Sequence, residues 1–515
     1  MMRVDRTLLT LGLAAMAAPA IAVPVPSPSP APLAVDARRV IAEAFGLGQA
    51  GDCRGALGKL DPLVTTLLPG AERNSVQLLR MNCLAPAGRG AEVAAVQREL
   101  AAADPKNPMV RGFGVMIAAD SGDMKAAGEA LAQVAEQLPA GLNGITGRLW
   151  RAVAQRLSQT REIALRDRIS VALARADWQP TDMPQLRSDI AESAIDVLVR
   201  RGEVAEAELL LPRVTAPESL FEMAITRSHA PLWPQLADKM GPHSTRAVDA
   251  FALDRLAAFA ATPDDATARL GAVRALVLLG RYAEASEAAS SVRVVEGMDE
   301  EAVATVRLDA QALGMTGGRA AAVARLQPFA MLDATRTPVA VSGVIALAET
   351  LDEAGRAEEA LAAARQALTR GAAALSPWGA GWLKRTEICA LSTLGRRAEA
   401  DAKAVALRAA ATDNQAAAIE ASLCAKQADA AEPIAVKTLA TADGAALIAD
   451  QFQPDDALWA RSGSRLRALW SVFLKRPAVK AAFEKNARIL PESLWPLQIE
   501  RPIPRASSAG DLPTT

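Results

Sequence analysis

Residues 347–360 read LAETLDEAGRAEEA. Strong helix formers stand on both sides of Gly355, and Ala360 follows it by five residues. Glycine tolerates the left-handed φ that a tight turn between helices requires. The first turns of the second helix then lie against the first helix, where only a small side chain fits. The stretch therefore predicts two antiparallel helices joined at Gly355 and closely packed at Ala360.

The same turn recurs along the chain, at Gly51, Gly88, Gly122, Gly202, Gly280, Gly318, Gly355 and Gly395, with successive spacings of 37, 34, 80, 78, 38, 37 and 40 residues. The fifth residue after each glycine is small: Ala56, Val93, Ala127, Ala207, Ala285, Val323, Ala360 and Ala400. Such a period is the signature of stacked helical hairpins. Each long interval is close to two periods, so we expect further turns near residues 160 and 241, where Gly241 stands.

The clearest units resemble the tetratricopeptide repeat (TPR) family. Residues 347–360, followed by Ala367, match its Leu, turn Gly and two small Ala positions, and residues 277–285 and 394–400 are similar. Asp104-Pro105 and Pro139 match the closing Pro of the family. The units depart from it in lacking the Trp and Tyr of the first helix, and several are longer than the family's repeat. The resemblance covers residues 37–440 and is strongest at 265–410.

The resemblance implies an all-α fold, a right-handed superhelical array of antiparallel helical hairpins. It also implies binding of a protein or peptide through the groove lined by the first helix of each hairpin. This fold hosts many partners, so the resemblance does not identify one.

Composition agrees with helices and limits the partners. The chain has 515 residues, 51% hydrophobic but only 3% aromatic, with a single Tyr. Such a length is too great for one ordinary core. With 57 basic and 58 acidic residues, the net charge is −1. No large single-sign field exists to attract nucleic acid or anionic lipid.

The first residues predict export. Arg3 and Arg6 precede an apolar stretch, residues 7–18, and Ala20-Ile21-Ala22 supplies small residues at a cleavage site. This is typical of a secretory signal peptide cut between Ala22 and Val23, although an uncleaved N-terminal anchor is the alternative. The apolar run is too short for a membrane span, and no later segment is long enough. We therefore expect a periplasmic or secreted bacterial protein with no integral span in the mature chain.

Composition also divides the chain. Residues 1–22 form the signal peptide, 23–35 a Pro-rich linker, and 36–440 the helical repeats. Residues 441–500 hold six of the aromatic residues and are interpreted as a C-terminal helical cap for the last repeat; a surface for a partner is the alternative. Residues 501–515 are expected to be a disordered tail.

Few residues carry the pattern of a catalytic site. The glycines of residues 46–51 fit G-x-G-x-x-G, but the preceding segment is helical in pattern, whereas a dinucleotide site needs a strand there. His229 and His243 are the two histidines, in a Pro-rich stretch where they could meet. We expect no cofactor and no metal, and a non-catalytic scaffold of the cell envelope. The alternatives are a cell-wall enzyme of the lytic transglycosylase type and a structural assembly subunit.

Alignment of the turn glycines places candidate partner-binding residues on the groove. One hairpin contributes an acidic row, and two later hairpins contribute carboxylates, an aromatic ring and a cation: Asp189, Glu192, Asp196, Glu349, Asp352, Trp382 and Arg385. An exposed acidic row is also compatible with a role in solubility alone.

The four cysteines are spaced for local pairing. Cys53 and Cys83 are 30 residues apart and Cys389 and Cys424 are 35 apart, each close to one repeat. An even cysteine count in an exported chain favours disulfides, and these two pairs join neighbouring helices of a stacked array. The alternative is four buried thiols.

Overall fold

The structure is a computed structural model that describes residues 35–372, 374–459 and 464–505. Within these ranges the chain is all-α, with no β-strand and one isolated bridge between Thr226 and Ala487. The chain forms two compact units, with the boundary between Val214 and Thr215. The predicted array of antiparallel helical hairpins is confirmed within each unit, whereas the sequence did not indicate this boundary.

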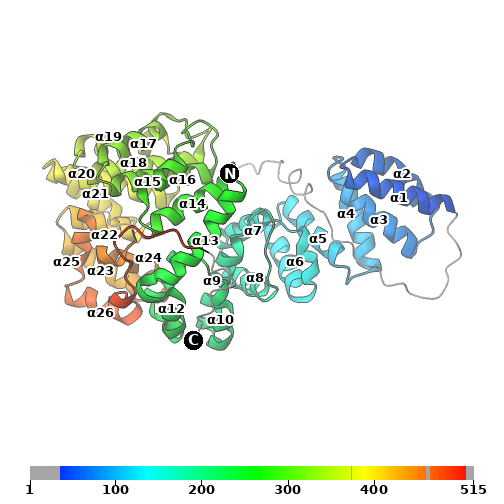
Figure 1. The fold of residues 1–515 in the computed structure, drawn as a ribbon, viewed down its shortest axis with the longest axis horizontal. Helices are drawn as coiled ribbons and strands as arrows, with labels where there is room; N and C mark the ends of the chain where they lie inside the picture. Colours follow the sequence, from blue (N-terminus) through cyan, green and yellow to red (C-terminus); the bar gives the residue numbers. More distant parts are fainter. Residues whose placement is uncertain (1–34, 373, 460–463, 506–515) are drawn as a thin grey trace. The chain divides into compact units, whose positions relative to one another are not determined.

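The first unit is a succession of hairpins (Figure 1). Its elements are α1 (Val35–Gln49), α2 (Cys53–Thr66), α3 (Ala71–Leu84), α4 (Gly90–Ala103), α5 (Pro108–Asp120), α6 (Met124–Gln137), η2 (Pro139–Gly144), α7 (Gly147–Gln159), α8 (Ile163–Arg175), α9 (Leu186–Arg200), α10 (Val204–Leu210) and η3 (Leu211–Arg213).

The second unit begins with short elements: α11 (Pro217–Ile225), η4 (Arg227–Leu232), α12 (Trp233–Met240), η5 (Pro242–Ser244) and α13 (Thr245–Ala261). Hairpins then follow: α14 (Ala266–Leu278), α15 (Tyr282–Ala289), α16 (Glu300–Met315), α17 (Arg319–Leu326), η6 (Gln327–Met331), η7 (Pro338–Ala340), α18 (Val341–Glu353), α19 (Ala357–Arg370), α20 (Pro377–Thr393), α21 (Arg397–Ala409), α22 (Gln415–Cys424) and α23 (Ala428–Leu439). The chain closes with α24 (Ala442–Ile448), η8 (Ala449–Phe452), η9 (Asp455–Ala457), α25 (Arg465–Phe473), α26 (Pro477–Asn486) and η10 (Glu492–Leu494).

The hairpin turns follow the predicted period with one correction. A residue with positive φ stands at each turn: Gly51, Gly88, Gly122, Arg161, Gly202, Gly241, Gly280, Gly317, Gly355, Gly395 and Lys426. The expected turns near 160 and 241 are thus Arg161 and Gly241. The prediction of Gly318 was wrong by one residue, because Gly317 has φ +81°, whereas Gly318 is the N-cap residue of α17 with φ −84°.

The small residues five positions after the predicted turns are all buried, as expected: Ala56, Val93, Ala127, Ala207, Ala285, Val323, Ala360 and Ala400. Counted from Gly317, the equivalent residue is Ala322, which is 2% exposed. The close contact between helices at this position forms the core that the first quoted stretch predicted.

The C-terminal module, residues 441–505, makes more contacts than a cap for the last repeat would make. α26 packs on α23 and α25 on α22, as a cap would. The module also contacts the start of the unit, through η8 on α11, α26 on η4 and η10 on η5. Both ends of the second unit are therefore joined by residues 441–505.

The prediction of a disordered tail at residues 501–515 is wrong for the start of that segment. Arg501 donates its backbone N–H to the Leu279 carbonyl at 2.9 Å, so the fold includes the start of that segment. The signal peptide and almost all of the Pro-rich linker, in residues 1–34, lie outside the described residues, as do residues 506–515. Among the described helices, none has the length and apolar character of a membrane span.

Candidate functional site

The hairpin of α7 and α8 departs from the repeat at two positions. Its turn residue is Arg161, with φ +61°, where most other hairpins have glycine. The fifth residue after the turn is Arg166 rather than Ala or Val. A left-handed residue that has a Cβ costs roughly 1–2 kcal/mol, and a guanidinium cannot replace a methyl group in a tight helix contact. Accordingly, α7 and α8 pack less closely than α5 and α6.

A pocket of ≈ 430 Å³ opens at this hairpin, and we name it the α7–α9 pocket. Its lining residues come from α7, α8 and α9: Trp150, Ala154, Gln155, Ser158, Arg166, Asp167, Ser170, Leu186, Asp189, Ile190, Ser193, Asp196, Val197 and Arg200. Trp150, Leu186, Ile190 and Val197 are each at most 6% exposed and provide an apolar floor. Charged and hydroxyl groups form the rim above it.

Asp167 organises the cationic part of this rim. Arg166 donates to Asp167 Oδ1 at 3.0 Å, and Arg200 of α9 donates to Asp167 Oδ2 at 2.7 Å. Arg166 also donates to Ser158 Oγ of α7 at 3.2 Å. The Asp167 side chain is 14% exposed and links α8 to α9, while Arg166 extends the link to α7 through Ser158. Two guanidinium groups are thereby held in place before any partner arrives.

The acidic row predicted from sequence lies partly in this pocket. Asp189 and Asp196 line it, together with Ser193 and Arg200 on the same face of α9. Glu192 belongs to α9 but does not line the pocket. The sequence reading missed Arg166, Asp167 and Arg200. The signal that could have found them is the loss of both the turn glycine and the small residue in the repeat expected near residue 160.

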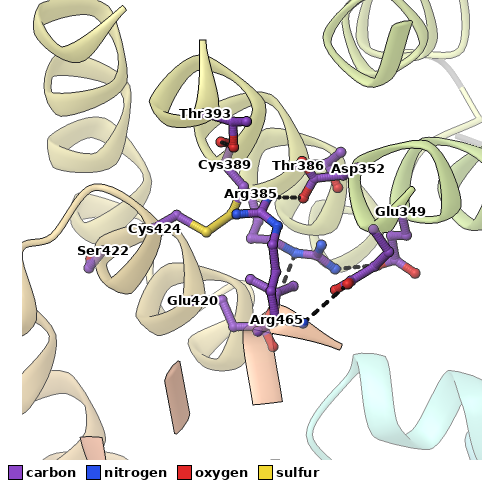
Figure 2. The surroundings of a disulfide bond; sticks show 12 residues. Glu349, Asp352, Arg385, Thr386, Cys389, Thr393, Glu420, Ser422, Cys424 and Arg465 are labelled. Atoms are coloured by element: carbon purple, nitrogen blue, oxygen red, sulfur yellow. Dashed lines mark hydrogen bonds and ion pairs between the residues drawn. A yellow bond between two sulfur atoms is a disulfide. The ribbon is translucent and has the colours of Figure 1, made fainter. Parts of the chain in front are cut away.

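The groove residues predicted in the second unit lie in a buried charge cluster (Figure 2). Arg385 donates to Glu349, and its Nε lies 3.0 Å from Oε2 of Glu420. These last two atoms form an ion pair without hydrogen-bond alignment. Glu420 accepts a hydrogen bond from Trp470 Nε1 at 2.9 Å, and Asp352 accepts one from Arg465.

Both Trp470 and Arg465 belong to the C-terminal module, so the protein itself engages the predicted groove residue Asp352 and its neighbour Glu420. Arg385, Asp352 and Glu420 are each at most 4% exposed. Burial raises the pKa of Asp352, opposed by Arg465, and burial raises the pKa of Glu420, opposed by Arg385. Trp382 lies beside the cluster with its ring centroid 5.0 Å from the Arg385 guanidinium. Asp352 and Arg385 thus cross-link the fold, whereas the Glu349 side chain is 36% exposed.

The disulfides have the pairing that the sequence favoured. Cys53 joins Cys83, between α2 and α3, with Cα atoms 4.8 Å apart. Cys389 joins Cys424, between α20 and α22, with Cα atoms 5.0 Å apart (Figure 2). Both pairs link neighbouring hairpins, which is why the spacing of about one repeat was informative.

The glycine motif and the two histidines lie in the following surroundings. Gly46 and Gly48 lie inside α1, so a helix stands where a dinucleotide site would need a strand. His229 is buried and lies 2.8 Å from Thr226 Oγ1, whereas His243 is exposed and lies 3.1 Å from the Trp495 carbonyl. Among the described residues, no group of three or more His, Cys, Asp or Glu side chains is placed to hold a metal ion.

Comparison with known proteins gives structural neighbours but no family. No protein-family model matches the chain, and no curated protein matches it. The TPR domain of P58(IPK) aligns over 86% of this chain and 100% of its own, with 14% identity and a TM-score of 0.20. Naa15/Naa10 bound to HypK-THB aligns over 88% of this chain and 79% of its own, with 11% identity and a TM-score of 0.21. At these scores the TPR-like character rests on the hairpins themselves, with their turn residues and buried small side chains.

Proposed function

We propose that this protein is a non-catalytic scaffold of the bacterial cell envelope that binds a protein or peptide, and that the α7–α9 pocket is its binding surface. The observation that carries the proposal is the contrast between the two units. The pocket of the first unit opens to solvent and joins a charged rim to an apolar floor. Of the groove residues predicted in the second unit, Asp352 and Arg385 are buried, and Asp352 is bonded to Arg465 of the C-terminal module.

The chemistry of the pocket suits a polypeptide. Binding sites typically combine an apolar lining with a few placed polar groups that fix orientation. Here Arg166 and Arg200 supply donors, Asp189 and Asp196 supply carboxylates, and Ser193 supplies a hydroxyl group. A partner segment with charges of both signs around an apolar residue would match this rim and floor.

Affinity capture with a charge-reversed pocket tests the proposal. Asp189→Lys and Asp196→Lys, made together, change the rim without removing the Asp167 link between helices. We expect the binding constant of a protein partner captured from envelope extract to weaken by about tenfold or more, which corresponds to about 1.4 kcal/mol.

The matched control is Asp120→Lys, which changes an exposed carboxylate of α5 outside the pocket. Equal capture by wild type, the pocket variant and the control would contradict the assignment of the pocket. Capture lost equally in the pocket variant and in the control would instead report a general charge effect.

Export is part of the proposal and has its own test. The small residues Ala20 and Ala22 and the apolar stretch before them support cleavage at Val23. Mass spectrometry of protein from the native envelope should find Val23 as the first residue. An intact Met1 would contradict cleavage of a signal peptide at this position.

A further inference from the structure

Residues 487–501 cross the second unit and contact a row of its elements, which we name the track. The track runs from α11 and η4 to η5 and then α13, and it ends at the turn between α14 and α15. Figure 1 draws this final stretch in dark red, as a trace with little helix of its own. η10 (Glu492–Leu494) is the short helical turn within it.

The backbone of this stretch is held at both ends. The N–H of Arg488 donates to the Ile225 carbonyl at 2.8 Å, beside the bridge between Thr226 and Ala487. The N–H of Arg501 donates to the Leu279 carbonyl at 2.9 Å. Hydrogen bonds to the main chain are the way in which extended peptides are recognised, since they hold the segment in one register.

The carbonyl groups of the stretch are bound by side chains of the track. Ser244 Oγ donates to the Leu494 carbonyl at 2.6 Å, and Arg281 donates to the Arg501 carbonyl at 3.1 Å. The buried side-chain amide of Gln453 bonds both to a backbone N–H group and to a backbone carbonyl group of the stretch. Its oxygen accepts from the Leu490 N–H at 2.9 Å and its nitrogen donates to the Arg488 carbonyl at 3.0 Å.

Four side chains anchor the stretch. The Arg488 guanidinium lies 3.3 Å from the Trp233 ring centroid and donates to the Ala224 carbonyl at 2.7 Å. Leu490 and Leu494 are 1% and 5% exposed. Arg501 donates to Asp249 at 2.6 Å. Between these anchors Ile499 is 63% exposed, so the stretch has one side on the track and one side in solvent.

The track also fits the backbone closely at its far end. A Cβ atom on Gly280 would stand 2.9 Å from the Ile499 carbonyl oxygen. Glycine at this turn therefore serves two purposes: it permits φ +72°, and it admits the crossing chain.

We infer that this track is a second peptide-binding site, distinct from the α7–α9 pocket, and that residues 487–501 are its intramolecular occupant. The site takes an extended peptide with the spacing of the anchors: an arginine, a leucine two residues later, a leucine four residues after that, and an arginine seven residues further on. A segment of another polypeptide with this pattern competes with the protein's own segment.

Peptide binding to the full chain tests the inference. The probe is a fluorescent peptide with the sequence of residues 487–505, ARILPESLWPLQIERPIPR. In the chain that carries Arg488→Ala, Leu490→Ala and Leu494→Ala, the internal segment has lost its anchors, and the peptide should bind saturably. Wild type should bind it at least about tenfold more weakly, because a tethered occupant competes at a high effective concentration. A peptide with the same three changes to alanine is the control and should not bind.

Absence of binding to a variant that keeps its helical circular dichroism spectrum would overturn the inference, and so would equal binding to wild type and variant. Hydrogen exchange on wild type provides a measurement that does not depend on the variant. The amides of Arg488 and Arg501 should exchange at least about tenfold faster than the buried amides of α20, because an exchangeable occupant opens locally. Exchange at the same rate as α20 would mean that the stretch opens only with the whole unit, which would also overturn the inference.

Discussion

Arg385 of α20 and Glu420 of α22 form a buried ion pair one helical turn before the disulfide between Cys389 and Cys424. Each cysteine follows its charged residue by four positions, so the two links join the same pair of helices side by side. Trp470 of the C-terminal module donates to Glu420 and connects the module to this pair. The cluster is thus the place where the repeats and the C-terminal module stabilise each other.

The disulfide of this cluster should contribute measurably to stability. Cys424→Ser opens a loop of 35 residues and should lower the free energy of unfolding by about 4 kcal/mol in the chain-entropy model. Denaturant titration of oxidised protein measures this. Non-reducing peptide mapping should recover Cys53–Cys83 and Cys389–Cys424, and four alkylatable thiols in exported protein would contradict both links.

The ion pair should show strong coupling between its partners. Arg385→Met leaves Glu420 and Glu349 facing each other without a cation and should destabilise the protein by about 3–5 kcal/mol. Arg385→Met with Glu420→Gln removes the buried charge and keeps an acceptor for Trp470, so we expect part of the loss to be recovered. A double-mutant cycle by denaturant titration measures the coupling, and additive effects would contradict the pairing.

Asp352 gives the second unit a distinctive dependence on pH. Burial raises its folded-state pKa above the ordinary 3.8, so the folded protein binds this proton more tightly than the unfolded chain. Its contribution to stability is complete below pH 3.8 and is lost as pH rises through the folded-state pKa. The difference in unfolding free energy, wild type minus Asp352→Asn, should therefore increase as pH falls from neutrality towards 3.8.

A control in the first unit should show the opposite sign. The hydrogen bond from Arg168 lowers the pKa of Glu136, so its contribution is present above the ordinary value of 4.5 and is lost as pH falls through the folded-state pKa. The difference in unfolding free energy, wild type minus Glu136→Gln, should decrease as the pH falls. Parallel changes for the two residues would refute the assigned directions.

Arg161 should prove unfavourable for the fold. Arg161→Gly relieves a left-handed backbone that costs roughly 1–2 kcal/mol, offset in part by the greater freedom of glycine in the unfolded chain. We expect a net gain of about 1 kcal/mol in the free energy of unfolding by denaturant titration. Lys426→Gly, at an equivalent turn with φ +58°, is the matched control and should gain as much. Loss of stability in both variants would show that the turns do not follow the glycine rule.

The regular hairpins could be predicted because their determinants are local. A turn glycine and a small residue five positions later act within one hairpin, so Gly355 and Ala360 reveal it in the sequence. The hairpin of α7 and α8 has Arg161 and Arg166 at these positions, and only the count of the period indicated it. Its pocket depends on the contact between Asp167 and Arg200, which is 33 residues away on another helix. No local sequence pattern indicates this contact.

The sequence by itself determined the helical content and the period of the hairpins, because these follow from backbone preference and from contacts within one hairpin. The spacing of the cysteines indicated which of them could pair, and the structure shows that they are bonded. Only the tertiary structure decided which groove residues are accessible. Asp352 meets Arg465 across 113 residues, and Leu279 meets Arg501 across a still longer interval. Contacts of this range arise because the C-terminal module packs against helices that precede it by more than a hundred residues. The repeat pattern describes contacts within one hairpin and between successive hairpins, so it does not encode them.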